Sequence, residues 1–183
     1  MNKIIAIVGM CGSGKSVAVN YFLKFNYKKV YFGGITFDKL KEENIEINPE
    51  NEKIMQIKLR DKYGMAAYAI LSLPKIKELI KTDNVVIDGL YSWDELKVLE
   101  KEFKEQLIVI AIVADKNIRY KRLENRDFRP YSLIEANKRD IFEIENVAKS
   151  GPIAYADYFV INNSDVSILE NKLNMILSEI ENN

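Results

Sequence analysis

The sequence contains no histidine, and it contains one cysteine among its 183 residues. The missing histidine excludes Ser-His-Asp hydrolysis, histidine-ligated metals and imidazole acid–base chemistry. The single cysteine, Cys11, excludes an internal disulfide framework and is typical of a reducing compartment. Any catalysis must therefore use lysine, arginine, carboxylates, hydroxyls, backbone amides or a bound cation.

The chain also lacks an excess of either charge and lacks a long apolar run. Lys and Arg number 27 and Asp and Glu number 27, so nothing in the net charge favours nucleic acid or a membrane surface. No apolar run approaches the roughly 20 residues that span a bilayer, and residues 4–8 are too few for the core of a signal peptide. We expect a cytoplasmic protein, a monomer or a homodimer, that acts on a small molecule.

Short runs of β-forming residues alternate with longer helical patterns, which is typical of an α/β fold. The run at residues 107–114, LIVIAIVA, has no polar alternation, which predicts a central parallel strand covered on both faces. The five predicted strands are residues 3–8, 28–32, 84–88, 107–114 and 158–161.

Capping motifs in the sequence predict where several helices begin. Ser92 with Glu95, and Ser132 with Glu135, fit the capping box, in which each side chain satisfies an orphan backbone donor. Asn48 followed by a proline predicts another helix start, and Ser164 or Asp165 is expected to begin the last helix.

The whole chain, residues 1–183, is long enough for one substantial core and is predicted to be a single domain, with 48% hydrophobic residues. No convincing strand lies between the second and third predicted strands, so residues 33–83 are read as a helical insertion that binds the acceptor. A small lid is expected at about residues 126–139. The core then comprises residues 1–32, 84–125 and 140–183.

The strongest signal is GMCGSGKS, which follows the first strand and precedes a helix, and which matches the phosphate-binding pattern G-x-x-x-x-G-K-[ST]. Glycines let the backbone wrap closely so that N–H groups form an anion site, and the next helix adds the positive end of its dipole. Lys15 is expected to reach the β- and γ-phosphates of a nucleotide. The predicted phosphate-binding residues are Gly9, Met10, Cys11, Gly12, Ser13, Gly14, Lys15 and Ser16.

A second anchor is Asp88, which ends the apolar run VVID. A carboxylate at the end of a buried strand suits a Mg²⁺ ion shared with the Ser16 hydroxyl. The alternative is an aspartate that only begins a turn, and the phosphate loop favours the metal role.

A third signal is the spacing of arginines. Arg119, Arg122 and Arg126 fall at i, i+3 and i+7 on one predicted helix, and Arg129 follows in the loop beyond. Guanidinium groups suit the charge that phosphoryl transfer spreads over oxygens, although a solvated helix face would show the same spacing. Arg139 can reach the same site or pair with a neighbouring carboxylate.

Acceptor-binding residues are expected around two glycine positions. Gly33 and Gly34 end the second strand, and Gly89 and Tyr91 follow the third. Arg60, in KLRDKYG, is the candidate for holding an acceptor phosphate, with a surface ion pair as the alternative.

These segments resemble the P-loop nucleotide kinases, the superfamily of the adenylate kinases and dephospho-coenzyme A kinases. The likeness spans nearly the whole chain: GMCGSGKS, NVVIDGLYS, RPYSLIEANKRD and ADYFVINNSDVSILENKL. It implies a three-layer α/β/α fold with a five-stranded parallel sheet, and it implies ATP and Mg²⁺ as cofactors. It also implies that Asn162 and Asn163 lie on the adenine side of the site.

The sequence departs from the family at the acceptor. Dephospho-coenzyme A kinases carry an acid just after the second strand, where this chain reads VYFGGITFD and first offers Asp38. The acceptor arginines of adenylate kinases are absent from GGITFDKLK and DGLYS. The leading hypothesis is ATP- and Mg²⁺-dependent phosphoryl transfer to a nucleotide-like acceptor, similar to a nucleoside monophosphate kinase, with Lys15, Arg122 and Arg126 as catalytic residues. The alternatives are a dephospho-coenzyme A kinase that uses Asp38 as base, and a nucleotide-dependent regulatory ATPase.

Overall fold

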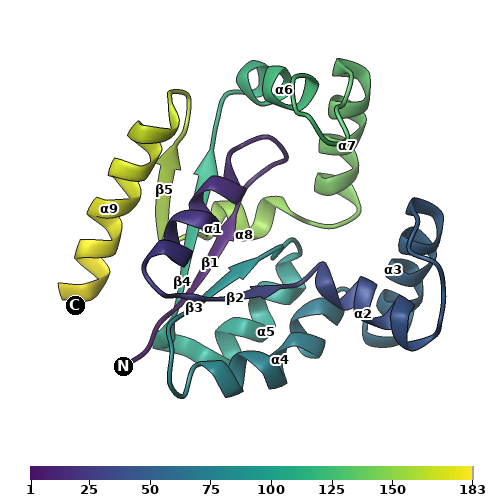
Figure 1. The fold of residues 1–183 in the computed structure, drawn as a ribbon, viewed down its shortest axis with the longest axis horizontal. Helices are drawn as coiled ribbons and strands as arrows, with labels where there is room; N and C mark the ends of the chain where they lie inside the picture. The colour runs from purple at the N-terminus through teal and green to yellow at the C-terminus, as the bar shows by residue number, and fades with distance from the viewer. Residues whose placement is uncertain (183) are drawn as a thin grey trace.

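A computed structural model describes residues 1–182, and its centre is one five-stranded parallel sheet (Figure 1). Residue 183, the last of the predicted domain, lies outside the described residues. All five predicted strands are confirmed, each within one residue at either end. The strands are β1 (Ile4–Val8), β2 (Lys28–Tyr31), β3 (Val85–Asp88), β4 (Leu107–Val113) and β5 (Tyr158–Ile161), in the spatial order β2-β3-β1-β4-β5.

Strand β1 lies at the middle of the sheet, between β3 and β4. Ile7 is opposite Asp88 of β3, and Val8 is opposite Ala111 of β4. Because every pairing is parallel, the carboxyl ends of all the strands meet at one edge of the sheet. The loop after β1 and the Asp88 carboxylate therefore lie at that same edge, where α/β folds bind their ligands.

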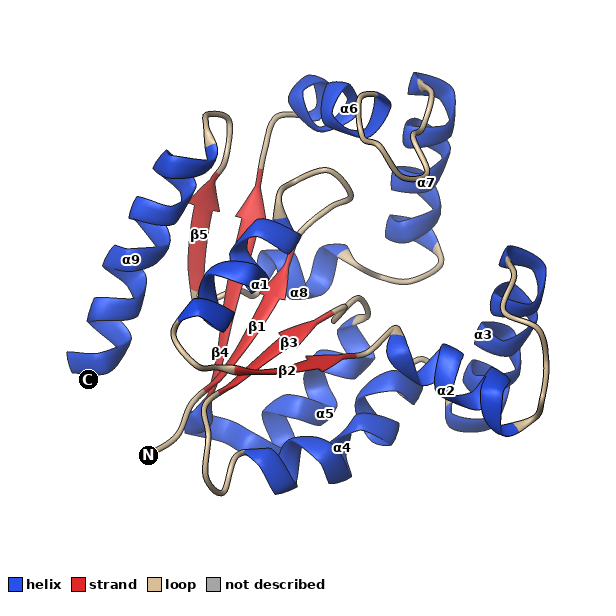
Figure 2. Cartoon of the chain, viewed as in Figure 1, coloured by secondary structure: helices blue, strands red, loops and turns tan. Residues whose placement is uncertain are grey.

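Helices cover both faces of the sheet and confirm the three layers (Figure 2). Helices α1 and α9 pack on one face, and α4, α5 and α8 pack on the other. The helices are α1 (Lys15–Lys24), α2 (Gly34–Glu42), α3 (Pro49–Tyr63), α4 (Ala67–Leu79), α5 (Trp93–Phe103), α6 (Lys116–Glu124), α7 (Leu133–Glu145), α8 (Ser150–Ala154) and α9 (Val166–Asn182), with a short 3₁₀ turn at Lys104–Gln106.

The predicted helix starts are present. Ser92 and Ser132 each accept a backbone N–H bond in a complete capping box, which begins α5 and α7 respectively. The Asn48 side chain caps α3, whose first residue is a proline. Helix α9 begins directly after Asp165, whose carbonyl accepts the first helical bonds.

Residues 33–83 contain α2, α3 and α4 and, within the described chain, no strand. Helices α2 and α3 extend past the end of β2, as Figure 1 shows, and join the same hydrophobic core as α4 through Leu40, Met55 and Leu59. The segment 126–139 comprises a loop and the first half of α7. No helix within residues 1–182 is both long and apolar enough to cross a membrane.

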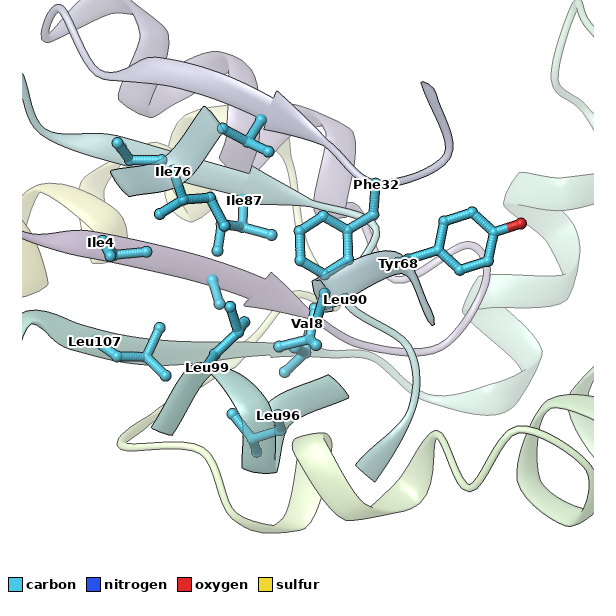
Figure 3. Packing of buried hydrophobic residues seen from close by; sticks show 14 of the residues in the cluster. Ile4, Val8, Phe32, Tyr68, Ile76, Ile87, Leu90, Leu96, Leu99 and Leu107 are labelled. Carbon is cyan, nitrogen blue, oxygen red and sulfur yellow. The ribbon is translucent and has the colours of Figure 1, made fainter. Parts of the chain in front are cut away.

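We expect Leu99→Ala in α5 to lower the free energy of unfolding by about 2–5 kcal/mol, because it leaves a cavity in a tightly packed core. Leu99 is fully buried beneath the sheet, among the residues in Figure 3. Urea denaturation measures the loss. Leu133→Ala, at an exposed position of α7, is the matched control, with an expected change within about 0.5 kcal/mol. Equal losses in the two variants would contradict this packing.

Candidate active site

The loop between β1 and α1 needs glycine at positions where no other residue fits. Gly9, Gly12 and Gly14 have φ values of 145°, 79° and 103°, in the region that side chains disfavour. A Cβ on Gly9 would lie 2.2 Å from the Ile112 carbonyl oxygen, and one on Gly12 would lie 2.6 Å from the Arg119 carbonyl oxygen. The loop therefore lies directly against β4 and α6.

Side chains from three places in the chain each donate a hydrogen bond to a carbonyl oxygen of this loop. The contacts are Lys15 Nζ to Met10 O at 3.0 Å, Arg119 Nη1 to Cys11 O at 2.9 Å and Asn162 Nδ2 to Ser13 O at 2.8 Å.

These contacts fix the orientation of three peptide units. In a trans peptide the N–H points opposite to the preceding carbonyl, so the N–H groups of Cys11, Gly12 and Gly14 point away from the three donors. The Ser13 hydroxyl is buried and has no hydrogen-bond partner within residues 1–182. Backbone N–H groups held in this way, at the start of α1, form an anion-binding concavity.

Lys15 lies among charges from both sides of the site. Burial, and next the nearby Lys149, lower the pKa of the Lys15 amine to about 7, while Glu143 and Asp88 oppose this shift. A phosphate group beside the amine would favour its charged form. The position of Lys15 therefore suits an anionic ligand.

The two predicted Mg²⁺ ligands, Ser16 and Asp88, come from α1 and β3. Ser16 is the second residue of α1 and is exposed, and Asp88 ends β3, where Lys29 pairs with it at 2.7 Å. Within residues 1–182 no three acidic or thiol side chains group so that they could hold a metal ion alone. A hydroxyl and a carboxylate supply the oxygen ligands that Mg²⁺ prefers, so the residues fit an ion that also takes phosphate oxygens and water.

A cavity of about 630 Å³ opens between α2–α3 and α7. Its lining combines aromatic rings, four cationic side chains and two carboxylates. The lining residues are Tyr31, Phe32, Gly33, Thr36, Phe37, Glu52, Gln56, Arg60, Tyr68, Gly89, Tyr91, Arg129, Lys138, Arg139, Phe142, Glu143 and Val147. Four of the five predicted acceptor residues line the cavity, whereas Gly34 lies beside it at the start of α2.

Arg60 is the best-placed of these cations for an incoming anion. Its Nε is buried without a hydrogen-bond partner in the described chain, and its guanidinium lies over the Tyr68 ring at 5.6 Å. Surface pairing, the alternative to acceptor binding, is therefore not observed for Arg60. A buried unpaired donor is costly, and an anion in the cavity would satisfy it.

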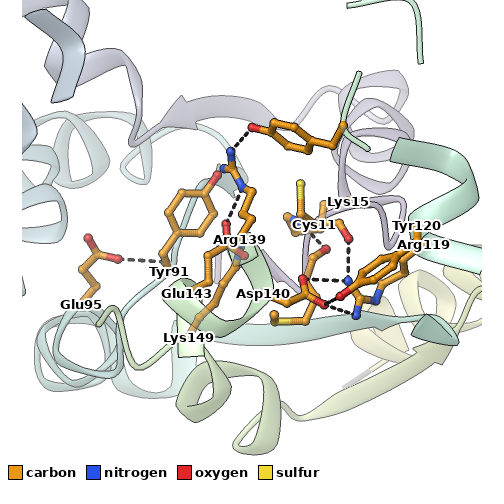
Figure 4. Close-up of polar contacts among 12 residues, drawn as sticks. Cys11, Lys15, Tyr91, Glu95, Arg119, Tyr120, Arg139, Asp140, Glu143 and Lys149 are labelled. Carbon is orange, nitrogen blue, oxygen red and sulfur yellow. Dashed lines mark hydrogen bonds and ion pairs between the residues drawn. The ribbon is translucent and has the colours of Figure 1, made fainter. Parts of the chain in front are cut away.

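Glu143 connects two cations near the phosphate loop (Figure 4). Its carboxylate accepts from Arg139 Nε at 3.1 Å and from Lys149 Nζ at 2.6 Å. Lys149 also lies over the Tyr91 ring at 4.2 Å, and burial lowers the pKa of its amine. The sequence offered no signal for Lys149, because no motif contains it and its partners come from separate elements.

The arginines of the predicted lid have separate partners. Arg119 is 7% exposed and forms a bidentate pair with Asp140 of α7, besides its bond to the phosphate loop. Arg122 donates to the carbonyls of Asn162 and Ser164.

The prediction that Arg126 shares one helix with Arg119 and Arg122 is wrong, because α6 ends at Glu124 and Arg126 lies in the loop beyond it. Arg126 stacks on the Tyr131 ring at 4.7 Å and donates to the Arg129 carbonyl, and neither it nor Arg122 lines the cavity. Arg129 and Arg139 do line it. Arg139 also pairs with Glu143, as one alternative predicted, and its reach to the site of the other lid arginines stays a prediction.

Asn162 and Asn163 hold loops together at the end of β5. The Asn162 side chain donates to the Ser13 carbonyl, and the Asn163 Oδ1 accepts from the Asp115 N–H at 2.9 Å. Their predicted place on the adenine side stays a prediction. The Asn162 contact was not foreseen, because 149 residues separate its two partners.

The five-stranded parallel sheet and the glycine loop together give this chain a P-loop kinase-like fold. The family described as AAA domain matches residues 5–143. A UPF0200 protein of Thermococcus sibiricus is 33% identical over 181 residues, covering 97% of this chain and 95% of the relative. A UPF0200 protein of Methanocaldococcus jannaschii is 33% identical over 187 residues, covering 98% and 91%. The chain belongs to the UPF0200 family and carries an AAA domain.

Solved structures share the fold at low sequence identity. TT1252 from Thermus thermophilus superposes with a TM-score of 0.66 at 16% identity and covers 97% of each chain. A shikimate kinase from Bacteroides thetaiotaomicron superposes with a TM-score of 0.59 at 16% identity and covers 98% of each chain. At this identity the likeness shows the fold alone.

We expect Glu95→Gln to reduce the dependence of stability on pH. Glu95 is buried in the α5 capping box, where it accepts from the N–H groups of Tyr91 and Ser92, and burial raises its pKa to about 7 from 4.5. The folded protein thus binds this proton more tightly than the unfolded chain does. That stabilisation is fully present below about pH 4.5 and is lost as pH rises through about 7.

Urea denaturation at about pH 5 and about pH 8 tests this prediction. The wild type should lose about 2–3 kcal/mol more than Glu95→Gln across that interval. The exposed Glu50→Gln in α3 is the control and should retain the wild-type difference. An unchanged pH slope in Glu95→Gln would contradict the raised pKa.

Proposed function

We propose that the protein is an ATP- and Mg²⁺-dependent phosphotransferase whose acceptor is a small nucleotide-like molecule. One observation carries this proposal: a glycine loop with fixed peptide orientations is followed by Lys15, which lies within electrostatic range of Glu143 in the lining of an aromatic cavity with four cations. The loop suits the phosphates of the donor, and the cavity suits a second, anionic substrate.

On the donor side, Lys15 and the loop N–H groups would bind the β- and γ-phosphates. Ser16 and Asp88 would hold Mg²⁺, which neutralises charge on the β- and γ-oxygens when it is bound. Arg119 and Asn162 donate to carbonyls of the loop, on the side opposite to the N–H groups that would bind the phosphates. The adenine would lie toward the β5–α9 loop, near Asn163.

On the acceptor side, Arg60 would bind the anionic group, and Arg139 lies between the cavity and the Glu143–Lys149 pair. Transfer to a phosphate acceptor needs no general base, because positioning and charge neutralisation carry the reaction. Arg122 and Arg126 would close over the transferring group only after exchanging their present carbonyl partners.

The placement of Asp38 bears on the sugar-hydroxyl alternative. Asp38 is exposed on α2 and is not among the residues that line the cavity. A dephospho-coenzyme A kinase would require this carboxylate beside the acceptor hydroxyl. The geometry therefore gives no support to Asp38 as a general base, whereas Arg60 suits a phosphate acceptor.

A screen of nucleoside monophosphates and dephospho-coenzyme A, read as ADP formed from ATP, tests the proposed function. Acceptor-dependent ADP formation supports a kinase. ATP hydrolysis that no acceptor changes would instead support a regulatory ATPase.

We expect Lys15→Ala to lower turnover by at least about a hundredfold, because it removes the cation that meets the donor phosphates. The free energy of unfolding should fall little, because the Lys15 amine makes a single hydrogen bond, to the Met10 carbonyl of its own loop. Lys24→Ala, at an exposed position of the same helix, is the control and should keep wild-type turnover. Full turnover in Lys15→Ala would overturn the assignment.

We expect Arg60→Gln to raise the acceptor KM by about tenfold or more, because charged hydrogen bonds contribute about 1.5–3 kcal/mol. The KM for ATP should stay unchanged, since Arg60 belongs to the acceptor cavity. Lys58→Gln, an exposed cation on the same helix, should change neither constant. A rise in the ATP KM alone would assign Arg60 to the donor.

A further inference from the structure

One face of α3 presents three polar side chains to the acceptor cavity. Glu52, Gln56 and Arg60 are spaced at i, i+4 and i+8, and all three line the cavity. Four residues advance a helix by about 6 Å, so the stripe is about 12 Å long between its end residues. That is close to the length of a nucleoside monophosphate from its phosphate to the far edge of its base.

The two ends of the stripe differ in charge and surroundings. Arg60 lies over Tyr68 and within electrostatic range of Glu95, which holds the loop after β3. This end of the stripe therefore adjoins the loop that follows Asp88. Glu52, at the other end, is 14% exposed and contacts Arg129 of the α6–α7 loop at 3.4 Å.

The far end has unused hydrogen-bonding capacity. The Arg129 contact engages only Oε1 of Glu52, which leaves Oε2 available. The Gln56 amide forms no hydrogen bond within residues 1–182. A carboxylate can only accept a hydrogen bond, whereas an amide can donate and accept one. Glu52 and Gln56 together can therefore bind the edge of a base that presents both a donor and an acceptor.

We propose that Glu52, together with Gln56, selects an acceptor whose base carries an exocyclic amino group. This inference rests on the proposed function and names the acceptor as an amino-bearing nucleoside monophosphate, with its phosphate at Arg60. The amino N–H donates to Glu52, and Gln56 pairs with the neighbouring ring nitrogen. A base with an oxo group at the same place would set a carbonyl oxygen against the carboxylate, with no proton between them.

Two pairs of monophosphates that differ at one amino or oxo group test the proposal. AMP is compared with IMP, and CMP with UMP, by kcat/KM for ADP formation and by calorimetric binding without ATP. We expect the amino member of at least one pair to be favoured by about tenfold or more. Glu52→Gln should reduce that preference to below about threefold, because it replaces the charged acceptor by an amide that can also face an oxo group.

Three further variants separate base reading from a structural role of Glu52. Arg129→Gln removes the ion pair but keeps the carboxylate, so the amino preference should persist. Glu52→Asp keeps the charge and should retain part of the preference. Glu50→Gln, exposed on the same helix, should keep both wild-type turnover and preference.

The outcomes distinguish this inference from the proposed function. If ATP-dependent transfer occurs but neither pair differs by more than about threefold, the base-reading role is overturned and the kinase assignment stands. If Arg129→Gln abolishes the preference as fully as Glu52→Gln does, the ion pair and not the carboxylate is responsible, which also overturns it. If no acceptor is phosphorylated, the proposed function fails, and calorimetry still decides whether Glu52 discriminates the bases.

Discussion

The site depends on the way three carbonyl groups of the glycine loop are bound from outside. Arg119 and Asn162 come from α6 and from the end of β5, and they donate to the Cys11 and Ser13 carbonyls. Lys15 binds a third carbonyl of the same loop. Because each peptide is planar, binding the carbonyls on one side orients N–H groups on the other. The anion site is thus prepared by tertiary contacts before any ligand arrives, which reduces the entropy cost of binding.

The same contacts join the phosphate loop to α7. Arg119 bonds to Cys11 and to Asp140, and α7 also supplies Arg139 and Glu143 to the lining of the cavity. The Glu143 carboxylate binds both Arg139 and Lys149. Without this carboxylate, two cations would lie close together in a buried place with no charge to compensate them. One helix, α7, therefore supplies ion-pair partners to both the glycine loop and the cavity.

The local signals in the sequence predicted the fold well. Apolar runs, capping boxes and the glycine loop each act over a few residues, and the strands and the helix starts at Asn48, Ser92 and Ser132 follow from them. Arginine spacing was less informative. Helical spacing places Arg119 and Arg122 near each other, yet one is buried against Asp140 and the other binds the β5–α9 loop. The spacing of residues along a helix predicts which of them share a face, but it does not predict what packs against that face.

The sequence by itself determined the parallel α/β architecture and the phosphate loop, because both arise from patterns of neighbouring residues. Only the tertiary structure decided which charged side chains line the cavity and which polar groups in it stay unpaired. Arg60 and Lys149 show the reason: each has at least one neighbour from a distant part of the sequence, Glu95 for Arg60 and Tyr91 for Lys149. Such a juxtaposition depends on how the helices pack around the sheet, and no local pattern encodes it.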